Sequence, residues 1–306
     1  MSNRFVYPIV KDREGGVWIG TFYGGVNYLS PNTGQFECFA HSRFSNSVNG
    51  TVIGRFCEDT YGHIWIASDD GGLSRFSPKD KHFTHYLPDE HRNSLSYHNV
   101  HALCMDGDDL WIGTYTGGVN VLNTKTGVFR VYTAKAGDPT TLDRSSSYAI
   151  FKDREARIWV TSMSGVNLYN REEDNFTRIR DLGSWIMDID QDADGNIWFS
   201  SQGNGLFKYD PDKQEWTNYV HSSAPGALIN DQVNCVLIDG NGEMWIGTMN
   251  GLCKYNAKED QFELIPLDIP SRNICAIIED QRVLWLTTTK LSLIHISEPT
   301  RLRCIS

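Results

Sequence analysis

The chain has 306 residues, a formal net charge of −10, an aromatic content of 12% and 27 glycines. The acidic balance, with no stripe of Lys and Arg, argues against nucleic acid as a partner, because phosphate recognition needs clustered basic side chains. The sequence has no run of 18 apolar residues, so we expect no segment to span a membrane and no direct membrane contact. The first ten residues, MSNRFVYPIV, lack the charged start and apolar core of a signal peptide.

Seven tryptophans recur in one local setting along the chain: Trp18, Trp65, Trp111, Trp159, Trp198, Trp245 and Trp285. Their spacings are 47, 46, 48, 39, 47 and 40 residues. Within the third repeat the pattern predicts four strands, over 99–106, 110–114, 119–123 and 129–133, separated by Gly-, Asp- and Thr-rich turns. A period of about 40–50 residues with such short strands is typical of a β-propeller, in which each repeat is one four-stranded blade.

This reading gives six full repeats and a seventh that stops after its second strand. The sequence therefore predicts an all-β fold, a seven-bladed β-propeller over residues 1–290, as a fragment of a longer protein. Residues 291–306, LSLIHISEPTRLRCIS, match nothing upstream. The stretch 291–301 resembles the translation of a transposase adapter used in DNA-library preparation, and we interpret the whole segment as a non-native tail.

Length varies mainly in the connections between blades. From each repeat tryptophan to the aromatic residue of the fourth strand the distance is 17 or 18 residues, whereas the connection to the next blade's first-strand aspartate takes 16 to 24. Strand alternation places these connections at the same edge as the turn after the second strand. A binding site is expected there, because irregular loops on a rigid scaffold commonly form one.

The candidate ligand-binding residues combine aromatic rings with charged groups at that edge: Tyr23, Arg55, Asp69, Asp70, Tyr97, Tyr115, Tyr148, Trp185 and Arg272. The innermost strands are expected to present another row toward a central tunnel: Tyr7, Arg55, His101, Tyr148, Asp188 and Asn234. Aromatic rings beside carboxylates and guanidinium groups suit sugars, which offer apolar ring faces and many hydroxyls. They also suit other small ligands.

Several motifs in the sequence suggest a metal site or catalysis. DADGN at 192–196 is similar to the start of a calcium loop, but its counterparts in other repeats mark it as the recurring hairpin turn between the first two strands. The histidines from His82 to His101 would need a folded-back connection to bind zinc. The spacing singles out no pair of carboxylates for acid–base catalysis. We therefore predict no catalytic residue, no metal and no cofactor.

The repeat unit resembles the two-component regulator propeller repeat. The segments that carry this resemblance are IVKDREGGVWIGTFYGGVNYLSPNTGQF (9–36), IFKDREARIWVTSMSGVNLYNREEDNF (150–176) and DIDQDADGNIWFSSQGNGLFKYDPDKQEW (188–216). The resemblance implies the periplasmic sensor region of a hybrid histidine kinase from a glycan-degrading bacterium. It further implies that a second propeller and a β-sandwich domain of the same parent chain are partners, and that the parent forms a homodimer.

The resulting hypothesis is a sensor that binds a small molecule, an oligosaccharide above all, and signals by a change of conformation. On this hypothesis the fragment itself is not an enzyme. A protein-interaction scaffold is the first alternative, since propellers serve that role often. A propeller lyase or glycoside hydrolase is the second, and it would need two convergent titratable groups in one pocket.

Overall fold

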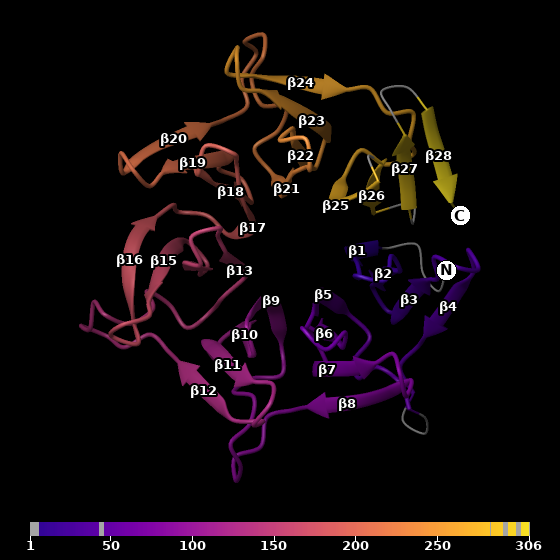
Figure 1. Cartoon of the computed structure of the whole chain (residues 1–306). Coiled ribbons are helices and arrows are strands. Elements are labelled where there is room, and N and C mark those ends of the chain that lie inside the picture. The colour runs from indigo at the N-terminus through magenta and orange to yellow at the C-terminus, as the bar shows by residue number, and fades with distance from the viewer. Residues whose placement is uncertain (1–5, 43–45, 282, 290–292, 298–300, 306) are drawn as a thin grey trace. The chain divides into compact units, whose positions relative to one another are not determined.

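The computed structural model describes residues 6–42, 46–281, 283–289, 293–297 and 301–305, with side chains described up to Thr289 except that of Tyr7. The chain divides into two compact units, Tyr7–Asp181 (unit 1) and Leu182–Ser306 (unit 2). Every sheet in both units has four antiparallel strands in chain order, so the all-β fold and the blade architecture are confirmed (Figure 1). Among the described residues, no helix is long and apolar enough to cross a bilayer.

Unit 1 contains four sheets. Their strands are β1 (Val6–Lys11), β2 (Val17–Thr21), β3 (Val26–Leu29) and β4 (Phe36–Phe39); β5 (Ile53–Glu58), β6 (Ile64–Ser68), β7 (Gly72–Ser77) and β8 (His82–Tyr86); β9 (Val100–Asp106), β10 (Asp109–Thr114), β11 (Val119–Asn123) and β12 (Phe129–Tyr132); and β13 (Ala149–Lys152), β14 (Ile158–Thr161), β15 (Gly165–Asn170) and β16 (Asn175–Asp181). The first strands of successive sheets contact one another, so β5, β9 and β13 lie innermost.

Unit 2 contains three sheets. Their strands are β17 (Ile186–Gln191), β18 (Ile197–Ser201), β19 (Leu206–Asp210) and β20 (Glu215–Tyr219); β21 (Val233–Ile238), β22 (Met244–Thr248), β23 (Gly251–Asn256) and β24 (Gln261–Ile265); and β25 (Ile274–Asp280), β26 (Val283–Thr288), β27 (Leu293–Ser297) and β28 (Arg301–Ile305). As in unit 1, the first strands β17, β21 and β25 contact each other in order.

The expected count of seven blades needs correction. The repeat sequence itself completes six four-stranded blades, not seven. The remaining sheet takes only β25 and β26 from the repeat. Its other two strands, β27 and β28, come from residues that the sequence analysis set apart as a tail, and β27 pairs with β26 from Val283↔Ser297 onward. The repeat motif therefore supplies six complete blades and only the first two strands of the last sheet.

A buried hydrogen bond fixes the first hairpin of most blades. The indole Nε1 of the repeat tryptophan donates to the first-strand aspartate at 2.8–2.9 Å in five blades: Trp18 to Asp12, Trp65 to Asp59, Trp159 to Asp153, Trp198 to Asp192 and Trp245 to Asp239. The other oxygen of the same carboxylate accepts backbone N–H groups of the turn, as Asp59 Oδ1 does from Tyr61 and His63. We call this arrangement the Trp–Asp clasp.

The clasp depends on the length of the turn. All five clasped pairs are six residues apart in the sequence, whereas Asp106 and Trp111 are five apart. There the Trp111 Nε1 has no hydrogen-bond partner among the described residues. Asp106 instead accepts hydrogen bonds from Lys152 and Arg171 of the next blade, at 3.3 and 2.7 Å. One residue fewer in the turn thus converts an intra-blade clasp into a link between blades.

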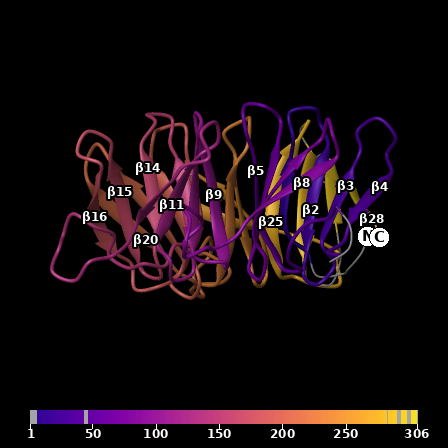
Figure 2. The ribbon, with the colours of Figure 1, turned by 90° about the horizontal axis from the view of Figure 1, so that it is seen from below.

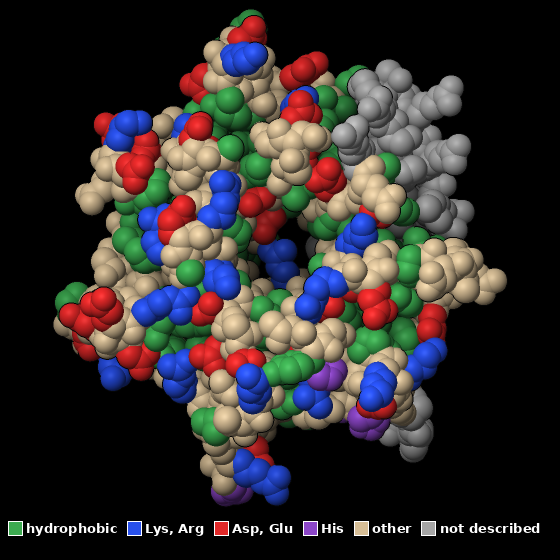
Figure 3. Space-filling model, in the orientation of Figure 1, with side chains coloured by type: hydrophobic (Ala, Val, Ile, Leu, Met, Phe, Trp, Pro, Cys, Tyr) green, Lys and Arg blue, Asp and Glu red, His purple; other side chains and the backbone are tan. Residues whose placement is uncertain are grey.

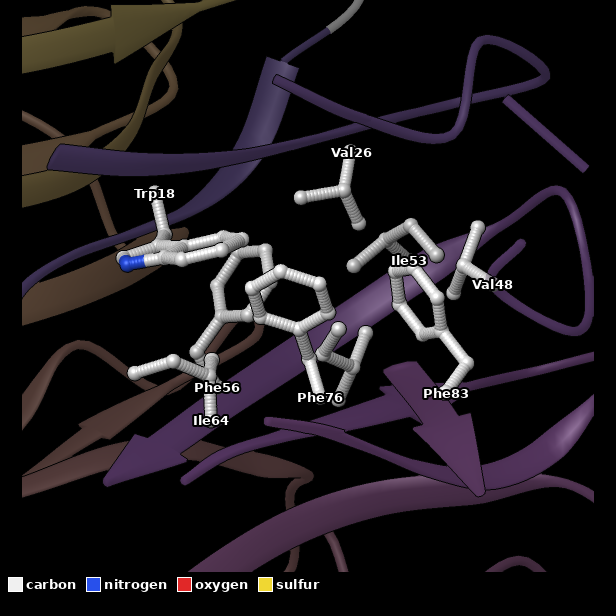
Figure 4. Close-up of a cluster of buried hydrophobic side chains, with 9 residues drawn as sticks. Trp18, Val26, Val48, Ile53, Phe56, Ile64, Phe76 and Phe83 are labelled. Carbon is white, nitrogen blue, oxygen red and sulfur yellow. The ribbon is translucent and has the colours of Figure 1, made fainter. Parts of the chain in front are cut away.

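The clasped tryptophans that follow fill the space between neighbouring sheets. Trp18 of the β1–β4 blade is 2% exposed and packs with Ile64, Phe76 and Phe83 of the β5–β8 blade (Figure 4). Trp65 packs in the same way against β9 and β10. Burying an aromatic side chain of this size stabilises the fold by roughly 2–3 kcal/mol. The clasp gives the buried indole N–H a hydrogen-bond acceptor, which it would otherwise lack.

A second recurring contact joins neighbouring blades near their outer strands. The hydroxyls of Tyr219 and Tyr255 both donate to Asp260 Oδ1, at 2.7 and 2.6 Å. In unit 1 the corresponding residues Tyr132 and Tyr169 both donate to Asp174. We call this arrangement the tyrosine clasp. Burial, and then the partner groups, raise the pKa of both donating tyrosines in unit 2, so these hydroxyls keep their protons.

Removing a clasp carboxylate is expected to destabilise the protein. Asp59→Ala strands the buried Trp65 N–H and two turn amides, and should cost about 2–3 kcal/mol of unfolding free energy. Urea titration followed by tryptophan fluorescence measures this cost. Asp80→Ala, at an exposed turn position, is the matched control. A loss for Asp59→Ala no larger than that of the control would contradict a structural role for the clasp.

Candidate functional site

The blade connections and the turns after the second strands meet at one edge of each unit, which we call the loop edge. In unit 1 its described residues are 22–25, 40–42, 46–52, 69–71, 87–99, 115–118, 133–148 and 162–164. Backbone hydrogen bonds tie the two kinds of segment together, including Tyr23 N to Thr51 O and Tyr115 N to Asn99 O. The predicted placement of the variable connections is therefore confirmed. Strands run from this edge to the opposite one, where the other hairpins turn (Figure 2).

A β-bulge at the loop edge re-aims one residue of the innermost strand in each of five blades. At each bulge one residue of the first strand has no partner on the second strand; these residues are Gly54, His101, Met187, Asn234 and Cys275. Bulges are common next to binding sites because they turn a side chain out of the strand's alternation. The sequence analysis named His101 and Asn234 for this row. It also named Arg55 and Asp188, each of which directly follows a bulge residue, Gly54 or Met187. The side chain of Tyr7 lies outside the described residues.

His101 is the centre of the most concentrated polar cluster at the loop edge of unit 1. Its imidazole stacks on Tyr148 at 4.7 Å and meets Tyr115 edge-on at 6.1 Å. The Nδ1 atom lies 3.3 Å from Asp69 Oδ1, close enough for an ion pair when the ring is protonated. These four side chains come from three consecutive blades, and we call them the His101 cluster.

The His101 cluster contains acceptor oxygens without donors. Asp69 Oδ1 is buried and has no hydrogen-bond partner among the described residues, since the His101 contact is not aligned as a hydrogen bond. Asn99 Oδ1, in the connection that enters β9, is also buried without one. Gly54 lies close to Asp69, because a Cβ there would stand only 3.3 Å from Asp69 Oδ1. Buried acceptors of this kind call for a donor from outside the protein.

Tyr148 contributes both a ring face and a protonated hydroxyl. It is 8% exposed, and burial, followed by the nearby Tyr115 and Asp69, raises its pKa to about 12. Tyr115 is 41% exposed and supplies an accessible ring at the same place. The cluster therefore offers a ring platform, a neutral hydroxyl and unpaired acceptors. Figure 3 shows histidines over the β5–β8 blade among interspersed acidic and basic side chains.

Of the predicted residues in unit 1, the structure brings together Asp69, Tyr115 and Tyr148. Tyr23 is 69% exposed on the first blade and packs on Phe22 at 4.4 Å. Tyr97 is half-buried beside His98, at 4.7 Å. Tyr23 and Tyr97 lie at the loop edge, and Arg55 is half-buried on β5. The sequence analysis missed Gly54 and Asn99, because a missing side chain and an unpaired amide leave no pattern in one sequence.

Asp70 has a structural explanation. Its carboxylate accepts hydrogen bonds from Ser68 Oγ at 2.6 Å, Thr51 Oγ1 at 2.6 Å and the backbone N–H groups of Thr51 and Val52. Burial alone would raise its pKa, but these hydrogen bonds dominate and lower the pKa to about 2. The residue thus holds the connection between the first two blades against the turn after β6.

In unit 2 the loop edge carries a satisfied amide network. Gln202 donates to Asn234 Oδ1, and Asn234 donates to Asn273 Oδ1, both at 2.8 Å. Trp185 is 45% exposed beside Gln202, whose backbone N–H donates to the Trp185 carbonyl. Arg272 lines a groove of 470 Å³ with Leu264 and Ile265. The amides of this edge already bond one another, so the unpaired acceptors of the His101 cluster mark unit 1 as the stronger candidate.

The zinc and calcium sites considered from the sequence would need clustered ligand side chains. No group of three or more His, Cys, Asp or Glu side chains there is arranged to hold a metal ion. The DADGN segment is the predicted hairpin turn, since Asp192 Oδ1 accepts from Asp194 N and Asn196 N while Oδ2 accepts from Trp198.

Replacing Asp70 should change stability in a pH-dependent way. A carboxyl group whose pKa is lower in the folded than in the unfolded state stabilises above about pH 4, and this contribution disappears as the pH falls toward 2. We expect Asp70→Asn to be less stable than the parent at pH 7, with the difference shrinking between pH 4 and pH 2. Thermal melts across this range test it, with Asp80→Asn as control. A difference that stays constant with pH would refute the assignment.

Two segments of the chain, residues 94–116 and 227–250, match the profile of the family described as two-component regulator propeller. A curated protein named histidine kinase P4, from Formosa agariphila, is 24% identical over 180 residues, which is 55% of this chain and 13% of that protein. This chain therefore spans only a small part of the relative it matches. The predicted resemblance to two-component regulator propeller repeats is confirmed.

Solved structures with the same fold include proteins of different function. The extracellular domain of a protein described as a hybrid two-component system, from B. thetaiotaomicron, aligns with a TM-score of 0.62 and 18% identity, covering 98% of this chain and 48% of that one. A virginiamycin B lyase from Staphylococcus aureus aligns with a TM-score of 0.75 and 15% identity, covering 99% and 96%. At these identities the likeness shows the propeller fold alone.

Proposed function

Because this chain carries two-component regulator propeller repeats, we propose that it is the ligand-binding part of an extracytoplasmic sensor and that its ligand is an oligosaccharide. The observation that carries the proposal is the pair of buried acceptors without donors, Asp69 Oδ1 and Asn99 Oδ1, beside the exposed ring of Tyr115. Sugar hydroxyls supply donors to such oxygens, and a pyranose face packs on an aromatic ring. Gly54 adds no side chain that would crowd Asp69 Oδ1.

Signalling in this proposal needs binding but no bond-breaking step. A ligand that bridges Asp69 on the second blade, His101 and Tyr115 on the third and Tyr148 on the fourth favours one arrangement of these blades over another. A conformational equilibrium moves only by the difference in affinity between its two states. The membrane-spanning and kinase parts, a second propeller and a β-sandwich domain would belong to the parent chain. Its site of action would be the periplasm, in keeping with the extracellular two-component domain that shares the fold.

The test is calorimetric titration of the full chain with a panel of plant and host glycan oligosaccharides. We expect saturable binding of one class, with the sugar recovered unchanged. Asp69→Asn should weaken binding about tenfold or more, because a hydrogen bond to a charged acceptor contributes about 1.5–3 kcal/mol. His101→Ala should weaken it too, whereas the control Glu172→Gln, at an exposed hairpin turn, should bind as the parent does.

Each other outcome points elsewhere. If no sugar binds, the oligosaccharide proposal is wrong, and the protein-interaction alternative becomes the leading one. If a sugar binds equally well to Asp69→Asn and His101→Ala, the His101 cluster is not the site. If the sugar is consumed, Asp69 and His101, at 3.3 Å, become the acid–base pair of an enzyme, which would revive the lyase or hydrolase alternative.

A further inference from the structure

A groove of 610 Å³ lies between the β1–β4 and β5–β8 blades, at the hairpin edge opposite the loop edge of unit 1. It is bounded by the β1–β2, β3–β4, β5–β6 and β7–β8 turns. Its aromatic lining is Trp18, Tyr28, Phe36, Phe39 and Phe76. Trp18 stands 4.5 Å from Tyr28 and stacks on Phe39 at 5.9 Å. The volume is in the range of small-molecule sites.

The blade interface that holds this groove lacks the tyrosine clasp. The positions that hold Tyr132, Tyr169 and Asp174 at one interface, and Tyr219, Tyr255 and Asp260 at another, are occupied here by Phe39, Phe76 and Lys81. The backbone is kept, since Lys81 has a φ of 49°, close to the 53° of Asp174 and the 51° of Asp260. Two hydroxyls and a carboxylate that join blades elsewhere are therefore missing from this interface.

The rim of the groove is acidic. Its carboxylates are Asp12, Glu14, Glu37 and Glu58, and Lys81 is the one basic residue in its lining among the described residues. Lys81 Nζ pairs with Glu37 at 3.2 Å, and Arg13 pairs with Glu58 at 3.1 Å. Asp12 is already an acceptor, but its partners, Trp18 N–H and Gly16 N–H, are neutral. Two negative charges are thus left in excess beside the aromatic rings.

The pKa of Tyr28 is affected by the same carboxylates. Its hydroxyl lies in the lining, and burial, followed by the carboxylates of Asp12, Glu14 and Glu37, raises its pKa. Three carboxylates from two different hairpins therefore act on one point inside the groove. A positive group placed there would be attracted both by these carboxylates and by the faces of the aromatic rings.

We propose that this groove binds a small organic cation, an ammonium group carried on an apolar or aromatic body. The ammonium group would lie among Glu14, Glu37 and the Tyr28 hydroxyl, and the apolar body would pack on Phe36 and Phe39. The side chain of Lys81 is 67% exposed and pairs with Glu37. The ligand's ammonium group must therefore compete with Lys81 for Glu37, which weakens binding. The site is separate from the His101 cluster and does not depend on the sugar proposal.

The probe is phenethylammonium, and the matched neutral ligand is 2-phenylethanol, which has the same size and ring. Titration of the full chain by calorimetry should show phenethylammonium binding about tenfold more tightly, the combined effect of cation–π attraction and one exposed ion pair. Glu14→Gln and Glu37→Gln should each weaken phenethylammonium binding about two- to fivefold. The control Glu263→Gln, exposed on β24, should leave it unchanged.

Two further variants act in opposite directions. Lys81→Asn removes the competing cation with a residue that tolerates positive φ, and should strengthen binding about twofold or more. The triple variant Phe39→Tyr, Phe76→Tyr, Lys81→Asp rebuilds the tyrosine clasp and should abolish binding while a thermal melt shows an intact fold. If that variant does not fold, the glutamine and Lys81→Asn variants still decide. Equal binding of the two probes, no binding at millimolar concentration, or indifference to Glu14 and Glu37 would overturn the proposal.

Discussion

The Trp–Asp clasp is the interaction on which this architecture depends. A blade can bury a tryptophan against its neighbour only if the indole N–H finds an acceptor, and a buried carboxylate is tolerated only if donors surround it. The clasp meets both needs at once, as at Asp59, which is 1% exposed and bonded to Trp65 and two turn amides. Burial alone would raise the pKa of Asp59, but these hydrogen bonds lower it overall, so the group stays charged.

Fixing the hairpin edge in this way leaves the loop edge free to vary. The clasp secures the β1–β2 type of hairpin, and the bulge of the innermost strand lies at the other end of the same strand. The same bulge recurs in five blades, but the residue at the bulge differs. Gly54 has no side chain, His101 has an imidazole and Asn234 has an amide. One scaffold thus presents a row of interchangeable side chains, and chemistry can be altered at this row without disturbing the packing between blades.

Much of this scaffold is predictable from the sequence, because tryptophan spacing and turn residues determine it directly. The blade strands, the hairpin nature of DADGN and the edge that carries the variable connections were all predicted correctly. The number of blades was not predicted correctly: the repeat sequence completes six, and the last sheet takes β27 and β28 from a segment without the repeat motif. The bulges at Gly54 and Met187 were not predicted, because one extra residue in a strand leaves no pattern in a single sequence. The structural role of Asp70 was not predicted, because a carboxylate that accepts hydrogen bonds from backbone amides looks like any acidic loop residue in sequence.

The central claim is that the hairpin edge is a rigid scaffold and that the loop edge binds the ligand. The most direct test is an NMR titration of the full chain with the sugar that it binds, following the His101 imidazole and the indole N–H signals of Trp18, Trp65 and Trp159 in the same spectra. The account predicts that the His101 signals shift to saturation while the clasped indole signals stay in place. Shifts of the clasped indoles with an unchanged His101 would contradict it.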